Sequence, residues 1–402
     1  MRRAPDPPLR LAEGAEAPAP SACLQQNPDV LTIVLEHGAI LLDLRTATYY
    51  RLDRAGQFGQ EPPSLIKHDE QVHGASAVLS DSEATRGWPG LRSPLPFVTV
   101  IVPVRDGART LRDCLASLLA SDYPADRREI VVVDNDSKDR TAEIIRDFPV
   151  RHAQETRRGA SASRNRGIQL SQGEILAFTD ADCVVSNTWL SELVRGFESD
   201  KVGAVAGEIM AFPPSTGPER YMARRVPRWQ RANLDASRPS IVTASIAVRK
   251  PVFHQIGVFD PYLTRAQDTD FGWRFFRECP LELRYSARAI VLHRHRATTW
   301  DFFRHQANWG YGGVLVGLKY RLPSGMREEL RLWGALMNQL LELGGAAARY
   351  ARHGRRWDDL EYAYFDLLCR LARRLGALRG LAIDRQLHRD WARAGTSPAL
   401  DR

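Results

Sequence analysis

Hydrophobic runs alternate with helical patterns through the middle of the chain. Residues 97–104, 129–134 and 175–178 are near-continuous apolar runs, as expected for strands that a parallel sheet buries on both faces. Residues 111–119 place apolar side chains three and four positions apart, and residues 141–145 follow a cluster of helix-capping residues, so both predict helices. This alternation predicts an α/β fold with a doubly wound, mostly parallel central sheet, which binds ligands at the carboxyl ends of its strands.

The two ends of the chain have different patterns. Residues 1–22 are rich in Pro, Ala, Glu and Arg and predict a disordered tail, and residues 23–60 contain a small β meander. Residues 61–96 are rich in Gly, Pro and Ser and predict a linker to the domain at 97–320. Residues 321–402 read as a C-terminal helical region in which Leu alternates with Arg. Two interpretations of it stay open: contact with an anionic membrane surface, or packing against the preceding domain.

Composition limits the class of protein and its partners. The 402 residues carry a formal charge of +8, which suits nucleotide phosphates, nucleic acid or anionic lipid. Nucleic acid is not expected, because no zinc-finger, RNA-recognition or basic-plus-heptad pattern occurs. The five cysteines form no C-x-x-C pair, which favours a reducing compartment. Neither an apolar signal core nor a run of about 18 apolar residues is present. We therefore expect a cytoplasmic protein, either free or attached peripherally to the inner face of the membrane.

Two carboxylates follow the apolar run 175–178. Asp180 and Asp182 are separated by one residue, so on an extended chain they share a face. Paired anions at the end of a buried strand cost free energy unless a cation compensates them. Mg²⁺ and Mn²⁺ accept such oxygen ligands. The pair therefore predicts a Mn²⁺ or Mg²⁺ site, although strand capping alone could also explain so short a motif.

Four motifs in one order resemble a known family. They are Pro-Val-Arg-Asp at 103–106, Val-Asp-Asn-Asp-Ser at 133–137, Arg-Gly through Arg-Asn-x-Gly at 158–167, and Thr-Asp-Ala-Asp at 179–182. The chain resembles glycosyltransferase family 2 over about residues 97–320. The resemblance implies the Rossmann-like GT-A fold and an inverting transferase that uses a nucleotide sugar. By motif position, the residues that bind the nucleotide sugar would be Pro103, Asp106, Asp134, Asp136, Arg158, Arg164 and Asp180. The resemblance also implies that Asp182 binds the metal.

A second acidic motif, at 265–274, resembles the catalytic motif of the family. Gln267 stands where the family has Glu, and Asp268 keeps the catalytic Asp. Transfer with inversion needs a base that takes a proton from the attacking hydroxyl, and Asp268 is expected to be that base, with helix capping as the alternative. Gln267, Trp273 and Arg274 would face the acceptor.

A histidine is expected to complete the metal site. The resemblance implies a histidine here that binds the metal or the diphosphate. His293, which directly follows the apolar run 289–292, is the expected metal ligand, with His295 as the runner-up and a structural hydrogen bond as the alternative. The polar, basic stretch 213–239 reads as a loop that either grips diphosphate or faces solvent.

Two functions from different classes stay open. The first is a metal-assisted inverting glycosyltransferase that moves a sugar from a nucleoside diphosphate to an unknown hydroxyl acceptor. The second is a non-catalytic scaffold that binds a nucleotide sugar or a peptide in a peptide-modifying pathway. It rests on the N-terminal meander, which at 41–43 (Leu-Leu-Asp) and 49–52 (Tyr-Tyr-Arg-Leu) resembles the small PqqD-like peptide-binding chaperones. An accessory β-sheet is the alternative for this meander. The intact set of Asp134, Asp182 and Asp268 favours the enzyme.

Overall fold

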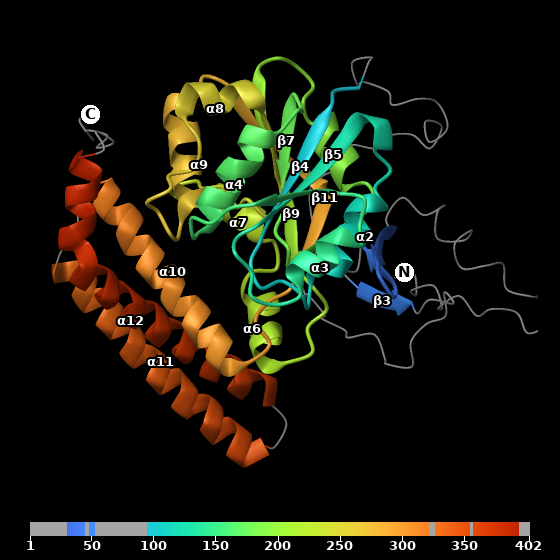
Figure 1. Ribbon diagram of the computed structural model, residues 1–402. Helices are drawn as coiled ribbons and strands as arrows, with labels where there is room; N and C mark the ends of the chain where they lie inside the picture. The colour runs from blue at the N-terminus through green and yellow to red at the C-terminus, as the bar shows by residue number, and fades with distance from the viewer. Residues whose placement is uncertain (1–29, 45–47, 53–94, 321–325, 354–356, 394–402) are drawn as a thin grey trace, which may run out of the picture. The chain divides into compact units, whose positions relative to one another are not determined.

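The computed structural model describes residues 30–44, 48–52, 95–320, 326–353 and 357–393 (Figure 1). A small N-terminal unit and a larger unit with all later helices and strands are described separately. The predicted tail at 1–22 and residues 61–94 of the predicted linker lie outside the described residues. The predicted domain boundaries therefore stay predictions.

The N-terminal unit is built on three consecutive strands. β1 (Val30–Leu35), β2 (Gly38–Asp43) and β3 (Thr48–Leu52) form a sheet in the order β1-β2-β3, with β2 and β3 antiparallel. Alternate residues of β1 are buried, so one face of this strand packs inward. The predicted meander is confirmed, while its resemblance to PqqD-like chaperones stays a prediction.

The larger unit is organised by one eight-stranded sheet with the order β6-β5-β4-β7-β10-β9-β11-β8. Its strands are β4 (Val98–Val104), β5 (Arg128–Asp134), β6 (Arg151–Gln154), β7 (Ile175–Phe178), β8 (Cys183–Val185), β9 (Val202–Ala211), β10 (Ile246–Arg249) and β11 (Glu282–His293). Four neighbouring pairs are parallel, whereas β10 runs antiparallel to both of its neighbours and β8 runs antiparallel to β11. The predicted mostly parallel sheet is confirmed, with two antiparallel strands that the sequence pattern does not distinguish.

Both faces of the sheet are covered, which explains the unbroken apolar strands. Alternate residues of β4 enter different cores: Val100 and Val102 pack with Leu115, and Ile101 packs with Ile168. The helices of this half are α2 (Leu111–Leu119), α3 (Thr141–Arg146), α4 (Ala160–Leu170) and α5 (Trp189–Arg195), and a 3₁₀ turn, η1 (Ala125–Arg127), precedes β5. Because β4 pairs with β5 and β7 in parallel, the loops after these strands open at one sheet edge.

The second half of this unit is mainly helical. Its helices are α6 (Gly217–Arg225), α7 (Trp229–Leu234), α8 (Lys250–Ile256), α9 (Gln267–Glu278), α10 (Thr299–Lys319), α11 (Met326–His353) and α12 (Trp357–Arg393). The prediction of a loop over 213–239 was wrong, because α6 and α7 occupy most of it. Thr216 and Glu219 form a capping box that starts α6, which explains how so polar a stretch becomes helical.

The C-terminal helices pack against α6 and α10. Arg225 Nη1 lies 2.7 Å from Asp366 Oδ1, and Arg220 forms two hydrogen bonds with Glu361. These α6 arginines are therefore paired with α12. Helices α10 and α12 approach closely where small residues meet: a Cβ atom on Gly310 would lie 1.9 Å from the carbonyl oxygen of Arg373. Within the described residues, we find no helix whose length and apolar character would suit a membrane span.

Candidate active site

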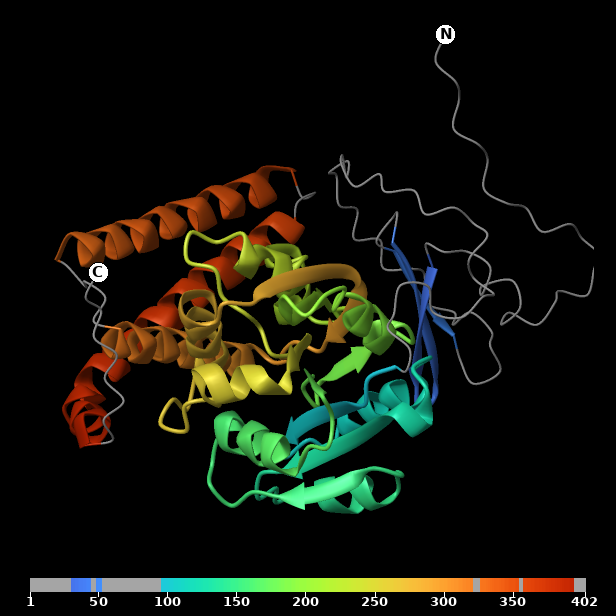
Figure 2. The same cartoon turned by 90° about the horizontal axis from the view of Figure 1, so that it is seen from above.

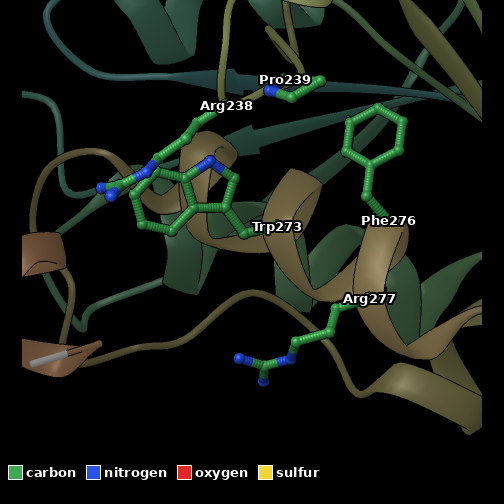
Figure 3. Close-up of a pocket in the computed structure, with 5 residues that line it drawn as sticks. All are labelled: Arg238, Pro239, Trp273, Phe276 and Arg277. Atoms are coloured by element: carbon green, nitrogen blue, oxygen red, sulfur yellow. The ribbon is translucent and has the colours of Figure 1, made fainter. Parts of the chain in front are cut away.

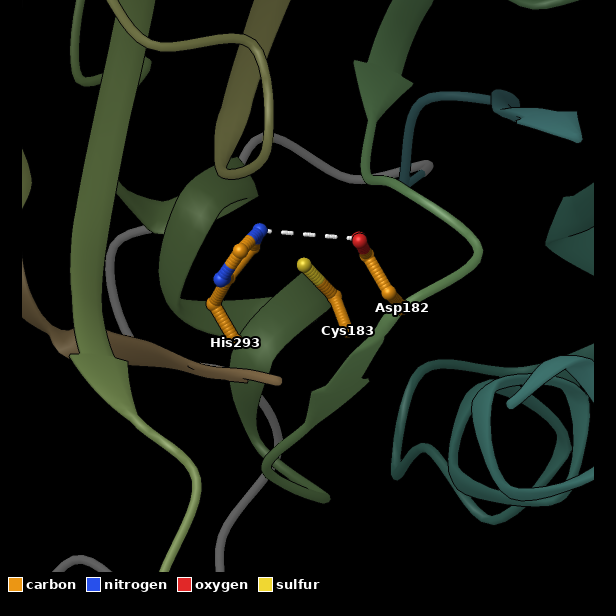
Figure 4. Close-up of side chains that lie close together, drawn as sticks. All are labelled: Asp182, Cys183 and His293. Atoms are coloured by element: carbon orange, nitrogen blue, oxygen red, sulfur yellow. Dashed lines mark ion pairs between the residues drawn. The ribbon is translucent and has the colours of Figure 1, made fainter. Parts of the chain in front are cut away.

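The pairing of β8 with β11 brings Asp182 and His293 together. His293, the last residue of β11, pairs in register with Cys183. The carbonyl oxygen of Asp182 accepts a hydrogen bond from the amide of Arg294 at 2.9 Å. In this arrangement Asp182 Oδ1 lies 3.6 Å from His293 Nε2 (Figure 4), and its Oδ2 lies 3.4 Å from Arg296 Nη2. The structure thus joins the two residues that the sequence proposed as metal ligands, although 111 positions separate them.

The donor atoms of this cluster fit a divalent cation. Asp182, Cys183 and His293 each offer one atom within 4.8 Å of the others. The Nδ1 atom of the buried His293 has no hydrogen-bond partner among the described residues. Burial and the nearby acids raise the pKa of the Cys183 thiol well above its usual value, so without a cation this thiol is protonated, and we assign the site to the other two donors. The remaining carboxylate and imidazole are donors that suit Mn²⁺.

Charge around Asp182 favours its ionised form. Burial by itself would raise its pKa, but His293 and Arg296 outweigh that effect, and the pKa lies below the usual value. An ionised carboxylate beside an imidazole is the form that binds a cation. Sequence reasoning did not single out Arg296, which lies three residues after His293.

Asp180, the first acid of the pair, has a different partner. Its Oδ1 lies 2.6 Å from Nη2 of Arg164, which α4 holds almost completely buried at 3% exposure. The guanidinium also lies 5.8 Å from the centre of the Phe259 ring. The structure therefore brings together two residues that the sequence assigned to nucleotide-sugar binding, and the buried cation balances the charge of Asp180.

Asp268 stands at the start of α9 in an environment opposite to that of Asp182. Its Oδ1 accepts a hydrogen bond from the amide of Thr269 at 2.9 Å. Burial raises the pKa of Asp268; the charge of Arg164 lowers it and that of Asp180 raises it, with a net increase. The preceding Ala266 has φ = 57°, a left-handed conformation that is uncommon for a residue with a side chain.

The next acid of the motif, Asp270, has a structural environment. It is fully buried, and its carboxylate contacts Lys319 Nζ at 2.6 Å, Tyr320 Oη at 2.9 Å and Arg274 Nη2 at 3.0 Å. Arg274 also donates to the carbonyl oxygens of Gly257 and Val258. The sequence assigned Arg274 to the acceptor, but in the structure its guanidinium holds the turn after α8.

The other two residues that the sequence assigned to the acceptor have unpaired polar atoms. Gln267 Oε1 and Trp273 Nε1 are buried without a hydrogen-bond partner within the described ranges. Trp273 lines a cavity of about 280 Å³ together with Arg238, Pro239, Phe276 and Arg277 (Figure 3). Neither Asp182 nor Asp268 lines this cavity, so it does not join the two acids.

The loops after β4 and β5 form a continuous wall. Asp106 Oδ1 accepts from the amide of Lys138 at 2.7 Å, and the Asp106 amide donates to Ser137 Oγ at 2.9 Å. Asp134 Oδ1 accepts from the amide of Ser137 at 3.0 Å. Asp136 lies 2.6 Å from Lys138 Nζ, and this hydrogen bond lowers the pKa of Asp136. Pro103, Asp106, Asp134 and Asp136 thus lie along one edge, as the sequence predicts.

Asn135 connects this wall to the exposed Arg158, and sequence reasoning missed its role. Its Oδ1 accepts from the amide of Gly159 at 2.8 Å, and its Nδ2 donates to the carbonyl oxygens of Glu155 and Arg157. Gly159 has φ = 123°, a conformation that favours glycine. The signal in the sequence was an amide between two candidate acids, directly after a buried strand.

Aromatic rings enclose the histidines next to Asp182. The ring centre of Trp229, on α7, lies 5.3 Å from that of His293 and also 5.3 Å from that of Trp309. His305, on α10, lies 5.2 Å from Trp309, and burial lowers its pKa to about 3. It is therefore neutral at pH 7. Trp229 and His305 were not predicted, because only the packing of α7 and α10 brings them to this edge.

Comparisons with known proteins identify the fold and the family. The model of the family "Glycosyl transferase family 2" matches residues 99–257. The chain is 30% identical over 251 residues to Glycosyltransferase AglE of Haloferax volcanii, covering 60% of this chain and 81% of that one. It is 29% identical over 330 residues to the Pre-mycofactocin glycosyltransferase of Mycobacterium tuberculosis, covering 79% of this chain and 68% of that one.

A solved structure shares the fold. The mannosyltransferase PcManGT from Pyrobaculum calidifontis, in complex with GDP-Man and Mn²⁺, superposes with a TM-score of 0.52 at 20% identity. The match covers 75% of this chain and 92% of that one. Together with the mixed central sheet, this similarity confirms the predicted GT-A fold. The sequence matches confirm the resemblance on which the site residues were assigned, and the chain therefore belongs to glycosyltransferase family 2 and is a glycosyltransferase.

Proposed function

We propose that this glycosyltransferase moves a sugar from a nucleoside diphosphate sugar to an acceptor hydroxyl, with inversion and with the help of a divalent cation. One observation carries the proposal: the Asp182 carboxylate lies beside His293 and Arg296, whereas the partly buried Asp268 carboxylate accepts a hydrogen bond from the Thr269 amide. The pKa of Asp182 is lowered and that of Asp268 is raised. Acids whose environments separate them in this way commonly divide the roles of charge stabiliser and proton carrier.

Asp182 and His293 would hold the cation. Their oxygen and nitrogen donors favour Mn²⁺, with Mg²⁺ as the alternative. When bound, such an ion would neutralise the charge that builds up on the leaving diphosphate. The presence of Mn²⁺ and GDP-Man in the structurally similar mannosyltransferase supports this assignment.

Asp268 would act as the general base. Its carboxylate removes the proton of the acceptor hydroxyl while the oxygen attacks the anomeric carbon from the face opposite the diphosphate. The new glycosidic bond forms as the bond from that carbon to the diphosphate oxygen breaks, which inverts the configuration. A positioned base of this kind contributes about 10²–10⁴ in rate. The raised pKa strengthens Asp268 as a base relative to an exposed aspartate.

The remaining predicted residues would hold the donor and the acceptor. We assign Asp134 to the base of the nucleotide, Asp180 to the ribose, and the exposed Arg158 to the phosphates. Arg164, which is buried against Asp180, would set the charge of that carboxylate. Gln267 and Trp273 remain assigned to the acceptor side, because each has a polar atom without a partner in the described part of the chain.

A donor screen tests the proposal. The purified chain is incubated with common nucleotide sugars and Mn²⁺, and release of free nucleoside diphosphate is measured. We expect turnover with one donor and loss of turnover in Asp182→Asn and Asp268→Asn. Asp126→Asn is the matched control, because Asp126 is exposed and lies before β5, at the opposite edge of the sheet. Unchanged turnover in either site variant would remove the role given to that residue.

The alternative, a non-catalytic scaffold, makes a different prediction. It would bind nucleoside diphosphates or peptides in calorimetry but release no nucleotide with any donor. The presence of Asp134, Asp182 and Asp268 in the arrangement described above favours the enzyme.

A further inference from the structure

The C-terminal helices carry most of the exposed apolar surface. Ten of the fourteen large apolar side chains that are exposed among the described residues lie on α11 and α12. Their exposed fractions run from 36% at Leu371 to 68% at Leu341. Isolated exposed apolar residues need no explanation, but a concentration on two neighbouring helices indicates a binding surface.

On α12 these residues form a stripe. Trp357, Tyr364, Leu371, Leu375 and Leu378 follow one another at intervals of seven, seven, four and three positions, which places them on one side of a helix. A neighbouring side is buried: Phe365, Cys369 and Ala372 are at most 5% exposed, and the first two belong to the core with α6 and α10. The stripe therefore lies beside the face of α12 that packs against α6 and α10.

Helix α11 repeats this arrangement. Met337, Leu340 and Leu341 are exposed, whereas Gln339 and Ala346 are buried. Because α11 ends at His353 and α12 begins at Trp357, the two helices form a hairpin, and both views show them side by side (Figures 1 and 2). The exposed stripes thus belong to the outer surface of this hairpin.

Arginines border the apolar stripes. Arg349 and Arg352 on α11 and Arg379 on α12 are exposed, and the Arg379 guanidinium also lies 5.5 Å from the ring centre of Tyr311 on α10. Arginine can bury its methylene chain along apolar surface while its guanidinium reaches anionic headgroups. A symmetric contact with a second copy would instead bring the same arginines of both copies into one interface. We propose that the α11–α12 hairpin lies on an anionic bilayer surface as an interfacial amphipathic element, with its apolar stripes in the headgroup boundary.

Vesicle sedimentation tests this proposal without requiring transfer. The full chain is mixed with vesicles of phosphatidylcholine alone or with added phosphatidylglycerol, and the bound fraction is measured. We expect binding to the anionic vesicles, falling with salt, and at least a tenfold loss of affinity in Leu371→Gln/Leu375→Gln/Leu378→Gln. Phe276→Gln is the matched apolar control, because Phe276 is 44% exposed on α9. It should bind like the original chain.

A charge variant tests the second element of the proposal. Arg349→Gln/Arg352→Gln/Arg379→Gln should lose affinity for anionic vesicles, whereas Arg140→Gln/Arg195→Gln/Arg284→Gln, with the same change in net charge at exposed positions elsewhere, should lose much less. Equal losses in the two triple variants would overturn the proposal, as would absence of binding to anionic vesicles by the original chain. The original chain could instead self-associate and fail to bind vesicles. If the Leu variant then abolished the self-association, the stripes would be an interface between copies.

The outcome is independent of the proposed reaction. The apolar and basic residues of the hairpin contribute no candidate ligand or base, so nucleotide release from donor is measured separately on the same variants. In the original chain, vesicle binding without nucleotide release from any donor would contradict the proposed function alone, whereas nucleotide release without vesicle binding would contradict the membrane surface alone.

Discussion

Replacing Gly310 by Ala should force α10 and α12 apart. The added Cβ would lie 1.9 Å from the carbonyl oxygen of Arg373, whereas nonbonded heavy atoms are at their best separation at about 3.5–4.0 Å. The obstacle is helix backbone, so it cannot rotate away as the end of a long side chain could. Overpacking of a close contact costs about 1–3 kcal/mol, and the upper end of that range applies here.

The helix propensity of Ala opposes part of this cost. Ala is favoured over Gly in a helix by about 1 kcal/mol, which leaves a net loss of about 2 kcal/mol. For a unit of about 300 residues with an unfolding entropy of about 2.1 cal/mol/K per residue, this corresponds to a decrease of roughly 3 °C in the melting temperature. Differential scanning calorimetry of the full chain measures it.

The same helix offers a control of opposite sign. Gly313 is exposed, and a Cβ atom on it would have no neighbour within 4 Å. Gly313→Ala should therefore stabilise the chain by up to about 1 kcal/mol through propensity alone. If Gly310→Ala raised the melting temperature as Gly313→Ala should, the close crossing of α10 and α12 would be refuted.

Three further predictions concern residues of the site and its supports. Asp270→Asn should cost about 3–5 kcal/mol of stability, because it removes the charge that Arg274 and Lys319 share in a buried position; urea unfolding measures this. Burial raises the pKa of Asp268, so kcat/KM should fall as the pH drops through a value above about 3.9. Arg164→Gln removes a charge that lowers this pKa and should move the fall to higher pH in a pH–rate profile. His293→Ala should raise the Mn²⁺ concentration for half-maximal activity at least roughly tenfold, a loss that even an outer-shell partner can cause, whereas the exposed His254→Ala should not.

Each of these has a contradicting result. A loss of stability below about 1 kcal/mol for Asp270→Asn would mean that its carboxylate is not needed to balance the two cations. A shift of the acid limb to lower pH in Arg164→Gln would contradict the sign of its effect on Asp268. An unchanged Mn²⁺ requirement in His293→Ala would exclude this imidazole as a ligand.

The sequence predicts the strands that lead to the candidate site because their physical cause is local. Strands β4, β5 and β7 are buried on both faces and therefore read as unbroken apolar runs, and the acids that follow them are visible as the first polar residues. The same reasoning cannot find the antiparallel direction of β10. Its residues Ile246–Arg249 are buried like those of a parallel strand, and direction depends on the path of the chain before it.

The missed contacts join residues that are far apart in the chain. Arg225 was expected in a loop that either grips diphosphate or faces solvent, but it pairs with Asp366, which lies 141 positions later. Trp229 and His305 likewise reach the histidine edge only through the packing of α7 and α10. A pattern along the chain predicts which residues have unusual chemistry, whereas their partners follow from tertiary packing.

The proposed cation site depends on a very short edge strand. β8 has three residues and is the last strand of the sheet, and edge elements with few contacts open locally at a lower free-energy cost than central ones. Each such opening would separate the carboxylate at 182 from the imidazole at 293. A bound cation would therefore slow the hydrogen exchange of the amides in this strand. Affinity for the ion and local opening of the edge strand would then report on the same equilibrium.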